Sequence, residues 1–204
     1  MNIEKRLAQI ISILFHPLLM PSLGMLILLN SGSYLSLIPG EAKRAVFIVF
    51  SLSTFVFPAS LLPVLYFRRL ISDFEIHKRE ERFLPYSLIL ILYIISFIFI
   101  YRLPLNSYIH AYALTLPVLV ALLIIGNIRF RLNAHMMALG GLSGLIIALT
   151  ALFGIPLQSY FIGIILATGL TGTARKILAN YSSFELFGGF CTGFGASVLI
   201  MLLF

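Results

Sequence analysis

Three polar segments interrupt an otherwise apolar chain, and each of them carries arginine or histidine. The first reads DFEIHKREERFLPY, from Asp73 to Tyr86, and the second reads RFRLNAHMMALGG, from Arg129 onward. The third, TGTARKILANYSSFELFGGF, contains Arg175 and lies near the carboxyl terminus. Guanidinium and ammonium groups hold phosphate oxygens, and an imidazole beside them can protonate the oxygen of a leaving group. If folding brings the segments together, they predict a phosphate-binding site.

The residues expected to bind phosphate have cationic or amide side chains, and they are Lys78, Arg79, Arg82, Asn133 and Arg175. His135 begins an apolar stretch, where a histidine is expensive unless it is paired or hydrated, so it is a functional candidate. Each of these residues, taken alone, also has a simpler explanation that involves no ligand. These are solvated charge pairs in the first segment, a helix cap in the second, and an ion pair of Arg175 with Glu185 or contact with headgroups in the third.

The apolar stretches between the segments decide whether the segments converge. Seven stretches approach the length needed to cross a hydrocarbon core of about 30 Å, namely 7–29, 45–67, 86–101, 108–127, 134–153, 159–172 and 184–204. Two of them separate the first polar segment from the second, and two more separate the second from the third. All three segments therefore return to the same side of a membrane. Prolines in the first two stretches introduce kinks that can change the number of spans by one.

The composition is that of a membrane domain. Of the 204 residues, 60% are apolar and 10% are charged, and the mean hydropathy is +1.07. We expect one all-α domain, residues 1–204, built as a polytopic transmembrane bundle of six or seven spans. The net charge of +7 comes from basic residues between the spans, where they meet lipid headgroups, so nucleic acid is not an expected partner. Cys191 is the only cysteine, and no disulfide, metal or organic cofactor is expected.

Local patterns give further structural expectations. Glycines recur in the last three spans and predict that these spans pack closely at the centre, whereas the span 86–101 is expected to face lipid. The first polar segment is expected to form a short interfacial helix that ends at Pro85. His16, inside the first span, and His110, on the opposite side, are expected to lie away from the polar segments.

The order of these motifs resembles that of the membrane lipid phosphatases of the type 2 phosphatidic acid phosphatase superfamily. That family shows Lys with Arg-Pro, then Pro-Ser-Gly-His, then Ser-Arg followed by His and Asp. Arg82 matches the first-motif arginine, but Pro85 lies three positions later, and Lys78 or Arg79 takes the lysine place with altered spacing. The second motif becomes Leu-Asn-Ala-His and keeps only its histidine, His135.

The third motif departs further from the family pattern. It keeps Arg175, while Tyr181 stands where the nucleophilic histidine belongs and Glu185 replaces the aspartate that orients it. The resemblance implies His135 as general acid, with Tyr181, Glu185 and His77 as the remaining catalytic candidates. Because a neutral phenol without a nearby base is a poor nucleophile, the missing histidine indicates a protein that binds without cleaving.

The resemblance thus implies a multi-pass inner-membrane protein that is catalytically degenerate and either binds a phosphorylated lipid or serves as an accessory subunit of a membrane complex. An active lipid phosphate or diphosphate phosphatase with an altered residue set is one alternative, and a small transporter is another. Membrane lipids and membrane proteins are the expected partners. Basic residues favour a cytoplasmic location for the polar segments, whereas the resemblance implies a periplasmic one.

Overall fold

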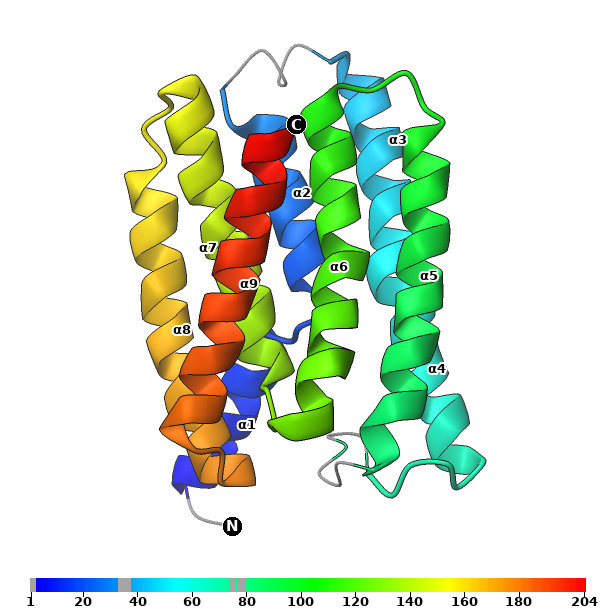
Figure 1. Ribbon diagram of the computed structural model, residues 1–204, viewed down its shortest axis with the longest axis vertical. Coiled ribbons are helices and arrows are strands. Elements are labelled where there is room, and N and C mark those ends of the chain that lie inside the picture. Colours follow the sequence, from blue (N-terminus) through cyan, green and yellow to red (C-terminus); the bar gives the residue numbers. More distant parts are fainter. Residues whose placement is uncertain (1–2, 33–37, 74–75, 77–79) are drawn as a thin grey trace.

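The computed structural model describes residues 3–32, 38–73, 76 and 80–204, and every regular element in these residues is helical. In chain order the helices are α1 (Ile3–Leu14), α2 (Met20–Asn30), α3 (Gly40–Ser51), the π-helical turn Leu52–Val56, α4 (Phe57–Phe67), the 3₁₀ turn Glu80–Arg82, α5 (Phe83–Tyr101), α6 (Ser107–Arg129), α7 (Ala134–Phe153), α8 (Gln158–Ala179) and α9 (Ser183–Leu203). They run up and down as one elongated bundle (Figure 1).

Six helical stretches in the described chain are long and apolar enough to cross a membrane. They are Gly40–Phe67, Glu80–Tyr101, Ser107–Arg129, Ala134–Phe153, Gln158–Ala179 and Ser183–Leu203. The protein is therefore a multi-pass membrane protein of the all-α class, as the sequence predicts. The amino terminus, the link between α6 and α7 and the link between α8 and α9 all lie at the lower end of the bundle in Figure 1.

The first expected span, 7–29, is broken in the structure. The helix α1 ends at Leu14 and α2 begins at Met20, because Pro17 has no N–H to continue the helical ladder. The imidazole Nδ1 of His16 accepts a hydrogen bond of 3.3 Å from the backbone N–H of Leu18 within this break. Together α1 and α2 run from the lower to the upper end of the bundle, so the chain crosses it once as two short helices (Figure 1).

Two expected boundaries are wrong. The helix α8 continues past 172 to Ala179, so Arg175 lies on a helix and not in a polar link. It ends only at Asn180, whose φ of 51° is the left-handed conformation that closes many helices. Pro85 does not end an interfacial helix either, because it lies in the first turn of α5, where a proline removes no hydrogen bond that the helix needs.

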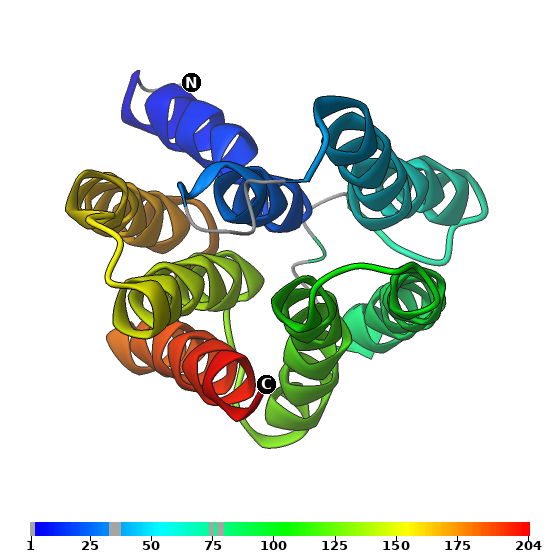
Figure 2. The ribbon, with the colours of Figure 1, turned by 90° about the horizontal axis from the view of Figure 1, so that it is seen from above.

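The centre of the bundle is α7, which is the most buried of the six spans, followed by α6. From above, α2, α6 and α7 face the middle of the bundle, and α5 and α8 lie at its periphery (Figure 2). The glycine-rich α8 and α9 are therefore outer helices, contrary to expectation. Close packing is confirmed for α7 with α9, where Gly140 lies against the backbone of Phe190 and Gly193 against that of Met137.

We expect Gly193→Ala to destabilise the protein by about 1–3 kcal/mol, because the added methyl group meets the carbonyl oxygen of Met137 and neither backbone can move freely. Gly195→Ala, two residues later on α9, is the matched control, since its methyl group meets open space. Thermal unfolding in detergent micelles, followed by circular dichroism, should give a lower midpoint for the first variant only. Equal midpoints would contradict the close contact of α7 with α9.

Candidate functional site

Tyr181 lies at the lower end of the bundle with three guanidinium groups around its ring. It follows Asn180, the residue that ends α8, and its side chain is buried. The Cζ atoms of Arg131, Arg82 and Arg175 lie 4.4, 5.6 and 5.7 Å from the centroid of the ring. An aromatic face attracts cations through its quadrupole, so the tyrosine holds together three groups that otherwise repel one another.

Arg82 is only 2% exposed, yet its three hydrogen bonds to described residues all go to neutral acceptors. Its Nη2 donates to the hydroxyl of Tyr181 at 2.7 Å, and its Nη1 donates to Oδ1 of Asn127 at 3.4 Å. Its Nε donates to the carbonyl oxygen of Ile76 at 2.9 Å. A guanidinium removed from water without a neutralising partner is costly, and an anion bound beside it would relieve that cost.

Arg131 adds a second cation with neutral partners. It lies in the short link between α6 and α7, and its Nη2 donates to the carbonyl oxygen of Ala179 at 3.1 Å. Its Nε is buried and has no hydrogen-bond partner. The sequence does not single out this arginine, because nothing in its neighbourhood distinguishes it from Arg129, two residues earlier.

A chain of polar contacts links α8, α1 and α7. Arg175, which is 3% exposed, donates from Nη1 to the hydroxyl of Ser12 at 3.0 Å. The same hydroxyl lies 3.1 Å from Nε2 of His135, and that nitrogen is also 3.2 Å from the carbonyl oxygen of Ser12. The ring of His16 lies edge-on to His135, with the two centroids 5.7 Å apart. The expectation that His16 stays away from the site is thus wrong, because the break after α1 turns it inward.

Asn133 begins α7 and directs an unpaired donor into the protein. Its Oδ1 accepts a hydrogen bond of 3.0 Å from the backbone N–H of Met136, which caps the helix. The residue is only 1% exposed, and its buried Nδ2 has no hydrogen-bond partner among the residues that the structure describes. An unpaired buried donor next to a cavity is an energetic penalty that a ligand oxygen would remove.

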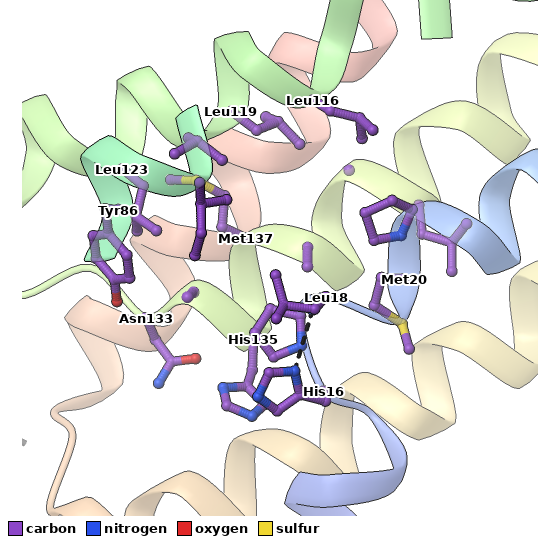
Figure 3. A pocket seen from close by; sticks show the side chains of 18 of the residues that line it. His16, Leu18, Met20, Tyr86, Leu116, Leu119, Leu123, Asn133, His135 and Met137 are labelled. Carbon is purple, nitrogen blue, oxygen red and sulfur yellow. Dashed lines mark hydrogen bonds between the residues drawn. The ribbon is translucent and has the colours of Figure 1, made fainter. Parts of the chain in front are cut away.

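The cavity above these residues has a volume of about 540 Å³, and the imidazole and guanidinium groups that line it lie together at one end. Its polar end is formed by Ser12, His16, Asn133, His135, Arg175 and Tyr181. Its walls are apolar side chains of α2, α6 and α7, which are Met20, Leu116, Leu119, Leu123, Met137 and Leu142. Figure 3 shows Asn133, His135 and His16 at one end, and Leu116 and Leu119 at the other. This polarity fits a ligand with an anionic head and an apolar chain.

Glu185, the remaining candidate that the structure describes, does not contact the arginines with its carboxylate. Glu185 closes a capping box at the start of α9, where its carboxylate accepts a hydrogen bond of 2.7 Å from the backbone N–H of Ser182. His110 lies in the first turn of α6, at the opposite end of that helix from Arg129, and its ring contacts Tyr101, as expected. His77, Lys78 and Arg79 lie outside the described residues. In the described part of the chain, no group of three His, Cys, Asp or Glu side chains is placed to hold a metal ion.

Comparison with known proteins identifies no relative, since no protein-family model, no curated protein and no solved structure matches this chain. The fold alone defines the class to which the protein belongs, that of multi-pass helical membrane proteins. Any narrower assignment depends on the chemistry of the site.

Proposed function

We propose that this protein binds a phosphorylated lipid, with the phosphate at the arginines and an apolar chain in the cavity. The observation that supports this most directly is the convergence of Arg82, Arg131 and Arg175 on the ring of Tyr181. Arginine suits phosphate because its planar fork donates two parallel hydrogen bonds to two oxygens. A soluble phosphate compound would not need the apolar walls that continue upward from this end.

The position of Tyr181 favours binding over the catalytic cycle of the lipid phosphatases. It occupies the place of the histidine that attacks phosphorus in that family, but its hydroxyl accepts a hydrogen bond from Arg82, a group that cannot take up a proton. Its ring serves as a platform for cations. Arg82, His135 and Arg175, the three residues that keep the family's motif order, nevertheless all lie at this end of the bundle. We therefore propose a lipid-phosphatase-like site that binds its ligand and in which Tyr181 does not attack phosphorus.

Arg82→Ala is expected to weaken binding of dioleoyl phosphatidate about 10- to 100-fold, because a charge-assisted hydrogen bond contributes about 1.5–3 kcal/mol. Arg129→Ala is the matched control, since Arg129 is an exposed arginine at the same end of the bundle. Native mass spectrometry of protein released from phosphatidylcholine nanodiscs containing phosphatidate would measure the bound fraction. The control variant should bind as the wild type does.

A second substitution separates ligand binding from folding. Arg82→Lys keeps the positive charge and loses the planar fork, so we expect a folded protein with intermediate affinity for phosphatidate. The proposal is wrong if the wild-type protein binds phosphatidate no better than phosphatidylcholine, or if Arg82→Ala and Arg129→Ala lower binding equally. The latter result would mean that the basic end attracts anionic lipid only through its overall charge.

A further inference from the structure

Ser12, which no motif selects, forms a pair with the motif histidine His135. On the basis of the proposed phosphate site, we infer that Ser12 is a nucleophile toward phosphorus, with His135 as its general base, so that the protein transfers a phosphoryl group from its lipid ligand to Ser12. A nucleophile requires a base within hydrogen-bond reach and an open approach for the reacting atom. The Ser12 hydroxyl lies 3.1 Å from Nε2 of His135, and both side chains line the cavity.

The packing of α1 directs Ser12 at the site. Ala8 and Ser12, one helical turn apart, are the buried residues of this helix, while Ile10 and Ile13 are exposed on its other faces. The buried face of α1 packs against α8, which carries Arg175. The break at Pro17 then lets the chain turn away, so α1 does not have to continue through the cavity. The hydroxyl of Ser12 is thereby placed at the polar end of the cavity.

The geometry around His135 suits both stages of a proton transfer. With the proton on Nδ1, Nε2 accepts the hydrogen bond of the Ser12 hydroxyl. After the proton moves to Nε2, the resulting imidazolium can donate to the carbonyl oxygen of Ser12, which lies 3.2 Å away. Arg175 donates to the Ser12 hydroxyl oxygen at 3.0 Å, so it stabilises negative charge that develops there.

Asn133 supplies a donor for the phosphoryl group. Asn133 lines the same cavity two residues before His135 and close to it (Figure 3), and within the described part of the chain its buried Nδ2 has no hydrogen-bond partner. A donor placed in advance toward an oxygen that gains charge lowers the barrier of the reaction, because it needs no reorganisation. A bound phosphate would therefore give a partner both to the amide of Asn133 and to the arginines.

In the transfer step, the Ser12 Oγ–H bond breaks, its proton passes to Nε2 of His135, and the Oγ–P bond forms as the bond from phosphorus to the leaving oxygen breaks. His135 returns the proton to that oxygen, which leaves as the alcohol of the lipid, or as its phosphate if the ligand is a diphosphate. Water then attacks the phosphoserine with His135 again as base, and inorganic phosphate and the free Ser12 hydroxyl result. No oxidant, reductant or further reactant is needed.

The test uses the purified full chain in phosphatidylcholine nanodiscs with ³²P-labelled dioleoyl phosphatidate and, separately, farnesyl diphosphate labelled at its terminal phosphate. We expect label on the wild-type protein that resists acid and is lost in alkali, as phosphoserine is. Phosphohistidine would be lost in acid, and phosphotyrosine at Tyr181 would survive both treatments. Ser12→Ala should lack the label and release phosphate at least about 100-fold more slowly, while Ser22→Ala, a serine on α2 that does not line the cavity, should behave as wild type.

Acid-labile label, label that persists in Ser12→Ala, or equal phosphate release by wild type and Ser12→Ala would overturn the inference. So would a wild-type protein that binds either lipid yet neither becomes labelled nor releases phosphate, and in that case the proposed lipid binding would still stand. If neither lipid binds, the proposed function itself fails. Binding of phosphatidate by Ser12→Ala, measured by native mass spectrometry, shows that this variant is folded.

Discussion

Tyr181→Ala is expected to abolish phosphatidate binding and to lower the free energy of unfolding by about 3–5 kcal/mol, the range for loss of a buried aromatic ring. The ring separates three guanidinium groups, and its hydroxyl accepts a hydrogen bond from Arg82. Without the ring, the three guanidinium groups lose their cation–π contacts and repel one another across the cavity that the substitution leaves. Lipid binding by native mass spectrometry and thermal unfolding in detergent would measure the two effects.

Tyr181→Phe distinguishes the ring from the hydroxyl. It keeps the face on which the cations lie and removes one acceptor from Arg82, so we expect a loss of about 1–3 kcal/mol in stability and nearly wild-type phosphatidate binding. It should also leave any phosphate release unchanged, because the ring of Tyr181 contacts the cations and its hydroxyl does not attack phosphorus. A Phe variant as defective in binding as the Ala variant would show that the hydroxyl, and not the ring, organises the site.

Ala138→Phe is expected to weaken binding of dioleoyl phosphatidate about 100-fold and leave binding of glycerol 3-phosphate unchanged. Ala138 lies one turn above His135 on α7 and lines the apolar part of the cavity. A phenyl ring there takes the place of about four methylene groups of a lipid chain, each of which contributes about 0.8 kcal/mol when buried. The phosphate-binding residues lie below it and keep their contacts.

Ala151→Phe, on the same helix but exposed, is the matched control and should bind both ligands as the wild type does. Competition with unlabelled ligand on nanodisc-embedded protein would measure both affinities. If Ala138→Phe binds dioleoyl phosphatidate with unchanged affinity, the lipid chain lies outside the cavity. If it also loses glycerol 3-phosphate, the substitution has distorted the phosphate site.

The gathering of Arg82, His135 and Arg175 at one end of the bundle could be predicted because it depends only on span lengths and on the even number of spans between the polar segments. The length of a spanning stretch is set by the thickness of the membrane, so such stretches can be recognised in the sequence. The end of α8 was harder to predict, since Ala174 and Ile177 continue the helix through a segment whose charged residues resemble a link. Only the left-handed conformation of Asn180 marks its end.

Ser12, His16 and Arg131 could not be assigned to the site from the sequence. A serine in an apolar helix carries no signal of its own, and which face of α1 is buried depends on how it packs against α8. The proline after His16 indicated a kink, but the direction of the kink is a tertiary property. The role of Tyr181 was also hidden, because three cations from different elements meet its ring only in the folded chain.

The most direct test of the central claim is an experimental structure of the protein in nanodiscs containing phosphatidate. We expect phosphate density within hydrogen-bond distance of the guanidinium groups around Tyr181 and of Nδ2 of Asn133, with an acyl chain passing along Leu119 and Met137. Phosphate density found only at the bundle surface beside Arg129, with the cavity empty of lipid, would contradict it.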